Sequence, residues 1–161
     1  MPLIVDSGKC TGCRKCELAC SFEKEGVFNP AFSRIWIEEI GFPGIPVPII
    51  CHQCVNAPCA EVCPVDAISL HRKTGAYLVD NKKCIGCGKC VEACPWGAID
   101  LYPETGKAFK CDLCRGKPKC IDACNYGVIS LALERGAPDK RRHEIAEKIA
   151  EGWKKAVLQE D

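Results

Sequence analysis

Sixteen cysteines, about a tenth of the 161 residues, constrain this chain more than any other feature. Removing them from the 47% of hydrophobic residues leaves roughly 37% of the chain, which is little for an ordinary apolar core. We therefore expect something other than side-chain packing to hold the protein together. The cysteines fall into four groups of four, with none left over: Cys10, Cys13, Cys16 and Cys20; Cys51, Cys54, Cys59 and Cys63; Cys84, Cys87, Cys90 and Cys94; and Cys111, Cys114, Cys120 and Cys124.

The start of the chain and the cysteine spacing argue against disulfides and zinc. Residues 1–10 lack a basic start and their apolar run ends at Asp6, so they do not resemble a secretory signal, and cytosolic thiols reduce disulfides. No window approaches the ~18 apolar residues of a membrane-spanning helix. We expect a cytoplasmic protein, with export on a partner's signal as the alternative. Zinc sites usually come as two separated C-x2-C pairs, whereas each group here is a triplet followed by a fourth cysteine.

The spacing within each group predicts iron–sulfur clusters. The first and third groups read C-x2-C-x2-C-x3-C, the spacing of bacterial ferredoxins, and the second and fourth widen the middle gap to four and five residues. Three such cysteines on a looping backbone can converge on one cube, and the loop turns backbone N–H groups toward the sulfurs. The fourth cysteine lies about 6 Å further along a helix and reaches a neighbouring cluster. The sequence therefore predicts four [4Fe–4S] clusters in two exchanging pairs.

Short strand-like runs with turn residues between them predict an α+β fold of tandem bacterial ferredoxin-like units. The predicted strands are 3–5, 35–37 and 47–50 on either side of the turn 41–44, 67–70 with 77–79, 98–101 with 107–109, and 128–133. The stretch between the third and fourth cysteine of each group is expected to form one or two turns of helix. Tight and wide cysteine gaps alternate along the chain, which indicates duplication of an eight-cysteine unit.

Residues 137–161 form a separate segment with a different pattern. Pro138 and Asp139 suit the start of a helix. An apolar stripe then recurs every four residues, at Ile145, Ile149, Trp153 and Val157. The sequence predicts an amphipathic helix, which either packs on the rest of the chain or docks to a partner.

The four-group pattern resembles the four-cluster iron–sulfur subunits of the dimethyl-sulfoxide reductase family, which serve molybdenum and tungsten oxidoreductases. The resemblance covers residues 3–133 and all sixteen cysteines. It implies that groups one and four share two clusters, and that groups two and three share the other two. The implied ligand sets are Cys10, Cys13, Cys16 and Cys124; Cys111, Cys114, Cys120 and Cys20; Cys51, Cys54, Cys59 and Cys94; and Cys84, Cys87, Cys90 and Cys63.

The same resemblance implies a lobe of residues 1–45 with 106–136, a lobe of residues 46–105, and a C-terminal helix over 137–161. The end strands 3–5 and 128–133 would then pair. Asn29-Pro30, Ser33-Arg34 and Ala57-Pro58-Cys59 make the chain most similar to small subunits of tungsten aldehyde oxidoreductase-type and benzoyl-CoA reductase-type enzymes. A large catalytic subunit holding tungsten or molybdenum is the implied partner, with a flavoprotein or a ferredoxin as a second redox partner.

Nothing in the sequence builds a substrate site. No G-x-G-x-x-G or P-loop motif occurs, no nucleophile stands with a base, and the net charge of +1 does not indicate nucleic-acid binding. We predict an electron-transfer subunit rather than an enzyme, which relays single electrons through its clusters. The alternatives are a freely diffusing polyferredoxin and a structural metal module, and self-association would lengthen the relay.

Basic and aromatic residues near the cysteines are expected to tune the clusters. Trp96, directly after Cys94-Pro95, is expected to shield a cluster from water. His52 is not expected to be a ligand, because four cysteines satisfy each cluster. Residues 107–119 are the densest basic stretch and the predicted docking face for an acidic carrier, with ordinary solvated surface as the alternative. The basic residues expected to favour reduction are Arg14, Lys15, Lys82, Lys83, Lys89, Lys110, Arg115, Lys117 and Lys119.

Overall fold

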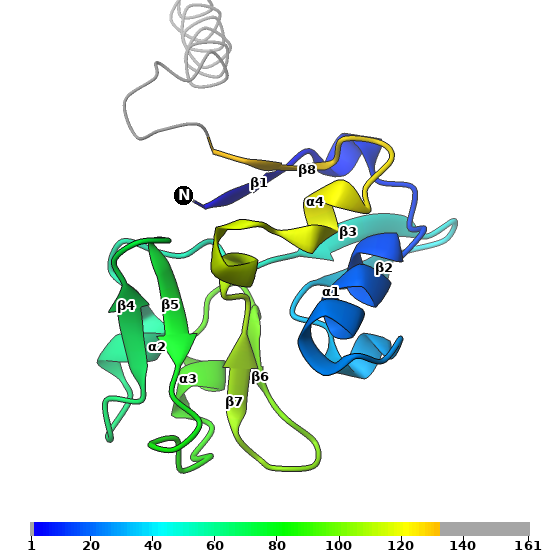
Figure 1. Cartoon of the computed structure of the whole chain (residues 1–161). Helices are drawn as coiled ribbons and strands as arrows, with labels where there is room; N and C mark the ends of the chain where they lie inside the picture. The colour runs from blue at the N-terminus through cyan, green and yellow to red at the C-terminus, as the bar shows by residue number, and fades with distance from the viewer. Residues whose placement is uncertain (1, 133–161) are drawn as a thin grey trace, which may run out of the picture.

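The computed structural model describes residues 2–132, which form a small α+β fold of short strands and short helices (Figure 1). Within this range eight strands pair into four two-stranded sheets. The strands are β1 (Leu3–Val5), β2 (Trp36–Ile40), β3 (Ile45–Ile49), β4 (Ile68–His71), β5 (Ala76–Val79), β6 (Ile99–Leu101), β7 (Ala108–Lys110) and β8 (Ile129–Leu131). The predicted strands and their turns are therefore present, with ends shifted by a few residues.

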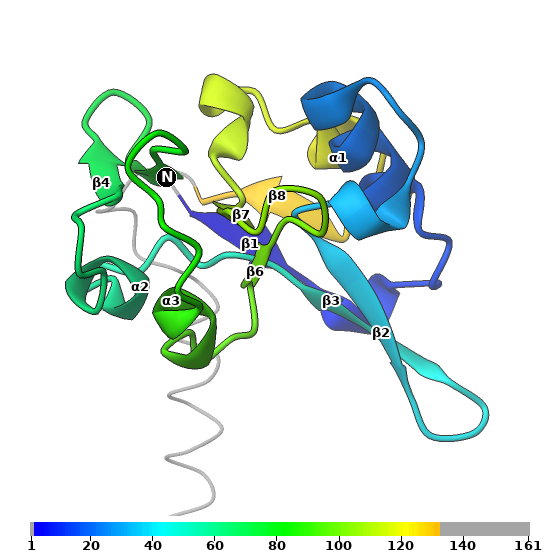
Figure 2. The ribbon, with the colours of Figure 1, turned by 90° about the horizontal axis from the view of Figure 1, so that it is seen from below.

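Three of the four sheets are local antiparallel hairpins: β2 with β3, β4 with β5, and β6 with β7. β3 contains Pro46 and Pro48, which have no N–H group to donate and fit here because a strand of a two-stranded ribbon has a free edge. The β2–β3 ribbon projects away from the rest of the described chain (Figure 2). Phe42 at its turn is fully exposed.

The fourth sheet joins the two ends of the described chain. β1 and β8 are antiparallel, with Leu3 opposite Leu131 and Val5 opposite Ile129, and both Leu3 and Ile129 are buried. The predicted pairing of the end strands is confirmed. It places the first cysteine group beside the fourth, although more than ninety residues separate them in the sequence.

The helices begin beside the third cysteine of each group, and one is longer than predicted. α2 (Pro58–Glu61), α3 (Lys89–Glu92) and α4 (Lys119–Asp122) are single turns, whereas α1 (Lys15–Glu25) has 11 residues. The prediction of one or two turns is therefore wrong for group one.

The residue after the fourth cysteine distinguishes group one from groups two and three, but not from group four, where Asn125 follows Cys124 and α4 is still a single turn. Pro64 and Pro95 disfavour a helical conformation of the cysteine before them, so the helices of groups two and three stop. Ser21 stands in the same position of group one, and α1 continues to Glu25. Short 3-10 turns complete the fold: η1 (Ser7–Lys9), η2 (Pro30–Phe32) and η3 (Leu113–Gly116).

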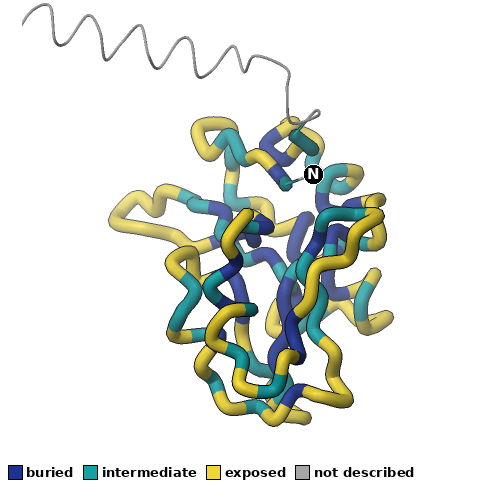
Figure 3. The backbone as a smooth tube through the Cα atoms, turned by 90° about the vertical axis from the view of Figure 1, so that its left-hand side faces the viewer, coloured by how far each residue is buried: buried dark blue, intermediate teal, exposed yellow. Residues whose placement is uncertain are grey.

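Buried residues form two clusters, and Figure 3 marks the buried positions along the backbone. The terminal core contains large aliphatic side chains and cysteines of groups one and four: Leu3, Ile35, Ile37, Ile50, Ala76, Leu113, Val128, Ile129, Cys16, Cys20 and Cys120. The central core contains smaller side chains and cysteines of groups two and three: Ala57, Ala67, Ile68, Ile99, Ala108, Cys59, Cys84 and Cys90. The lobe boundaries given above stay a prediction.

The predicted amphipathic helix over 137–161 lies outside the described residues, as does the last residue of the predicted strand 128–133. Between residues 2 and 132, no helix has the length and apolar character needed to cross a bilayer.

Candidate metal centres

Each of the four predicted ligand sets lines a cavity of its own. In each cavity, three cysteines come from one group and the fourth comes from its paired group. We name each cavity after the group that supplies three cysteines. The group-one cavity has Cys10, Cys13, Cys16 and Cys124; the group-four cavity has Cys111, Cys114, Cys120 and Cys20; the group-two cavity has Cys51, Cys54, Cys59 and Cys94; and the group-three cavity has Cys84, Cys87, Cys90 and Cys63.

Tight loops around the group-one and group-three cavities require glycine. Gly12 and Gly86 occupy the same position of their motifs, and their φ angles are 68° and 71°, a region that strains other residues. A Cβ on Gly86 would lie 2.4 Å from the carbonyl oxygen of Gly106. Each loop places one cysteine of its cavity at the surface: Cys13 in the group-one loop and Cys87 in the group-three loop are exposed.

Backbone N–H groups point at several sulfurs, as predicted for a looping backbone. Although burial opposes ionisation of Cys124, the N–H groups of residues 126–129 lower its pKa. Hydrogen bonds of this kind stabilise negative charge on sulfur. N–H donors reach five further sulfurs: Arg34 to Cys20 (3.3 Å), Ala67 to Cys63 (3.3 Å), Ala98 to Cys94 (3.4 Å), Ala108 to Cys84 (3.4 Å) and Leu113 to Cys111 (3.5 Å).

Several of the thiols that line the cavities are shielded from water, which raises their pKa. Burial raises the pKa of Cys16 and of Cys111 to about 12, and that of Cys59 to about 11. Such thiols are protonated at neutral pH and become ligands when a cation replaces the proton. The cavities therefore suit a positively charged group bound by several thiolates.

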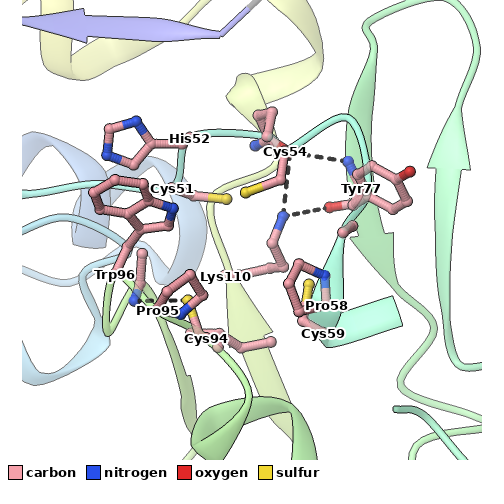
Figure 4. Close-up of a pocket in the computed structure, with 14 residues that line it drawn as sticks. Cys51, His52, Cys54, Pro58, Cys59, Tyr77, Cys94, Pro95, Trp96 and Lys110 are labelled. Carbon is pink, nitrogen blue, oxygen red and sulfur yellow. Dashed lines mark hydrogen bonds between the residues drawn. The ribbon is translucent and has the colours of Figure 1, made fainter. Parts of the chain in front are cut away.

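The cysteines of a cavity surround a space rather than a single point. The sulfurs of Cys51, Cys54, Cys59 and Cys94 face a common space in Figure 4. No disulfide joins any of the sixteen cysteines. In the described part of the chain, no three His, Cys, Asp or Glu side chains are close enough together to hold one metal ion. A polynuclear group that offers a separate corner to each sulfur fits this geometry.

Trp96 and His52 form one wall of the group-two cavity (Figure 4). Their ring centroids lie 4.2 Å apart, and about half of the Trp96 side chain stays exposed. Trp96 therefore lies between the cavity and solvent, as predicted. The four cysteines of this cavity leave no need for His52 as a ligand.

The basic residues of 107–119 do not form one surface, contrary to part of the prediction. The three basic residues within 115–119 are exposed, but Lys110 is only 4% exposed. Lys107 is half-buried, and its amine donates to the carbonyl of Cys84. All three residues of β7 are buried, because this strand packs beside β5 as well as β6. Only the end of the basic stretch is exposed, so the predicted docking face is reduced to residues 115–119.

Two buried polar groups beside the cavities are not evident from the sequence. The carboxylate of Glu17 in α1 is 1% exposed, accepts the N–H of Ile37 at 2.6 Å, and lies 3.5 Å from the guanidinium of Arg14. It ties α1 to β2 next to the group-one cavity. Gln53 and Lys110 form the other buried group, between the group-two and group-four cavities. Their positions beside Cys54 and Cys111 are the only signal that the sequence offers.

Four cysteine-lined cavities within a small α+β fold define an iron–sulfur protein of the ferredoxin class. Residues 44–134 match the family model of the 4Fe-4S dicluster domain, and residues 7–23 match a 4Fe-4S binding domain. The first match covers more than half of the chain, so the protein belongs to the 4Fe-4S dicluster family. This confirms the predicted kind of cofactor.

Three curated relatives are electron-transport proteins or oxidoreductase subunits by name. The polyferredoxin-like subunit of aliphatic sulfonate oxidoreductase from Pyrococcus furiosus is 46% identical over 71% of this chain and 65% of its own length. The putative electron transport protein YsaA of Escherichia coli is 41% identical, over 70% of this chain and 74% of its own. A tetrathionate reductase subunit from Archaeoglobus fulgidus is 38% identical, over 69% and 53%. The chain thus spans roughly half to three quarters of these relatives.

A solved structure shares the fold. The active-site complex BamBC of benzoyl coenzyme A reductase, in complex with zinc, contains a chain that aligns with a TM-score of 0.50 and 24% identity. The alignment covers 91% of this chain and 87% of that one. At this identity the likeness concerns the fold alone.

Proposed function

We propose that this protein is an electron-transfer subunit with four [4Fe–4S] clusters, one bound by the four cysteines of each cavity. The observation that carries the proposal is that the sixteen cysteines divide completely into four cavities with four cysteines each. The aligned N–H donors and the buried thiols around these cavities support it further. A bound cluster supplies one-electron exchange, and hydrogen bonds, charge and solvent exposure around it set the potential.

The cavities lie in an order suited to a relay. Neighbouring cavities are close enough for their cysteines to interact electrostatically, in the pairs Cys16 with Cys120, Cys111 with Cys51, and Cys59 with Cys90. These pairs give the order group one, group four, group two, group three. The exposed residues Cys13 and Cys87 belong to the two outermost cavities. Electrons would therefore enter at one end of the row and leave at the other.

We propose a catalytic oxidoreductase subunit of the tungsten or molybdenum type as one redox partner, and a flavoprotein or a ferredoxin as the other. The support is the names of relatives that are oxidoreductase subunits and the four-group pattern. Two lobes of tandem ferredoxin-like units in a reducing, cytoplasmic setting complete the proposal. A freely diffusing polyferredoxin is the alternative, since the same row of clusters would serve it.

Metal analysis of the anaerobically purified protein tests the cluster number. We expect about sixteen iron and sixteen sulfide per chain, with a brown colour that dithionite bleaches reversibly. Substitution Cys87→Ser should remove one cluster's worth of iron from the group-three cavity, and Cys13→Ser should do the same for the group-one cavity. Fewer than about twelve iron atoms in the unsubstituted protein, or zinc in their place, would contradict the proposal.

Co-purification tests the partner. Untagged pull-down from the native source, followed by metal analysis, should recover a large chain that contains tungsten or molybdenum. A protein that carries its clusters but recovers no such chain would favour the freely diffusing alternative.

A further inference from the structure

Lys110 is a buried cation with no carboxylate partner in the described structure. It is 4% exposed, and its amine donates to three neutral oxygens: the carbonyl of Tyr77 at 2.9 Å, Gln53 Oε1 at 3.2 Å and the carbonyl of Cys111 at 3.2 Å. The seven salt bridges found between residues 2 and 132 do not include it. Burying an ammonium group costs several kcal/mol unless a negative charge compensates it.

The position of Lys110 shows where such a negative charge would come from. Its side chain lines the group-two cavity (Figure 4), and the next residue is Cys111 of the group-four cavity. Its amine also donates to the carbonyl of Cys111, so Lys110 lies beside both cavities, at the place where the row passes from the terminal core to the central core.

Gln53 holds the amine in place. Its side-chain oxygen accepts from the Lys110 amine and from the N–H of Tyr77 at 3.0 Å, and its amide nitrogen donates to the carbonyl of Cys111 at 2.8 Å. The amine thus has an acceptor for each of its three N–H bonds. A cation fixed in this way needs no reorganisation when a neighbouring group changes its charge.

We propose that Lys110 is a charge-tuning residue that raises the reduction potentials of the clusters in the group-two and group-four cavities. The inference rests on the proposed function, because it needs clusters in these cavities. Reduction adds one negative charge to a cluster, and a nearby fixed cation stabilises that state. An electron that arrives from either outer cavity is thereby stabilised on the two inner clusters, where the two cores meet.

Removal of the charge tests the proposal directly. In Lys110→Met, redox titration of the anaerobic protein followed by electron paramagnetic resonance should show two of the four midpoint potentials becoming more negative. At the unsubstituted midpoint of those two clusters, the ratio of reduced to oxidised form should fall about tenfold. Lys73→Met removes an exposed lysine from the β4–β5 turn and should leave all four potentials unchanged.

A second variant keeps the test decisive if Lys110→Met binds less iron. Gln53→Glu places a carboxylate beside the amine, offsets its charge and retains the lysine, so the same two potentials should fall. Four unchanged potentials in a fully loaded variant would overturn the proposal. Loss of iron from one variant with no shift in the other, or loss from both, would assign Lys110 a structural role and overturn it too. Too little iron in the unsubstituted protein would instead refute the proposed function.

Discussion

The two cores of this protein are stabilised in different ways. All seven salt bridges of the described residues join side chains within 6–39 and 112–122, around the terminal core. Asp112 alone pairs with Lys24 at 2.6 Å and with Arg34 at 3.4 Å, in partly buried positions. None of the seven salt bridges involves a residue of 46–105, the segment that surrounds the central core.

The terminal core also has a longer helix and larger buried side chains than the central core. The terminal core has the 11-residue helix α1, the β1–β8 pair and several buried Leu, Ile and Val residues. The central core has two single-turn helices and is rich in alanine, so it buries less apolar area per residue. The difference indicates that side-chain packing and salt bridges contribute to the stability of the terminal core, whereas the central core depends more on its iron–sulfur clusters.

Removal of the clusters should have the largest effect, and it should affect the central core more than the terminal core. After treatment with an oxidant and a chelator, we expect backbone amides of α2, α3 and the β6–β7 hairpin to lose nearly all protection from hydrogen exchange. Amides of α1 and of β1–β8 should keep part of theirs. Exchange measured by mass spectrometry with and without clusters checks this, and equal loss around both cores would refute the contrast.

Two equivalent glycines offer a matched test of the loops. Gly86→Ala should cost about 2–4 kcal/mol, because it adds a contact of 2.4 Å with the backbone oxygen of Gly106 to the strain of positive φ. Gly12→Ala should cost about 1–2 kcal/mol, because its Cβ would meet Pro46 at 3.4 Å and only the strain remains. Anaerobic guanidinium unfolding and iron content of the two variants measure the difference. Equal losses would show that the group-three loop yields to the clash.

Substitution of Glu17, the buried carboxylate beside the terminal core, should have a smaller effect on the free energy of unfolding. Glu17→Ala should destabilise the protein by about 2–3 kcal/mol, because it leaves the buried N–H of Ile37 without its acceptor. Glu17→Gln retains an acceptor oxygen and should cost less than half as much. The unfolding midpoint and the hydrogen exchange of α1 and β2 measure both variants. Equal effects of Ala and Gln would mean that the charge, rather than the hydrogen bond to Ile37, stabilises the terminal core.

The sequence predicts the local elements and the cysteine groups well, because both are set by short-range patterns. The C-x2-C spacing places three cysteines on one loop, and turn residues such as Gly41 and Gly75 mark the hairpins. The partner cysteine of each cavity comes from another group, and spacing alone does not say which one, so the pairing rests on the family resemblance.

Properties that depend on tertiary packing were harder to predict. Lys110 belongs to a stretch that reads as a basic surface, yet its strand lies between two others and the side chain points inward. Glu17 looks like an ordinary helix charge, and only the contact with β2 makes it a buried acceptor. Ser21, in place of the proline of groups two and three, permits the longer α1 but does not predict it, because Asn125 stands at the same position of group four and α4 is a single turn.

Substitutions at the tip of the β2–β3 ribbon should have the smallest effect on stability, because the tip belongs to neither core. Phe42 is fully exposed, and Ile40 and Ile45 beside it are 60% and 66% exposed. Phe42→Ser should therefore change the free energy of unfolding by less than about 0.5 kcal/mol and leave iron content and the midpoint potentials unchanged. Ile37→Ala, in the same ribbon but 3% exposed within the terminal core, should cost about 2–5 kcal/mol. If Phe42→Ser were as destabilising as Ile37→Ala, the tip would have to be packed in the folded protein, and the terminal core would extend beyond the residues assigned to it.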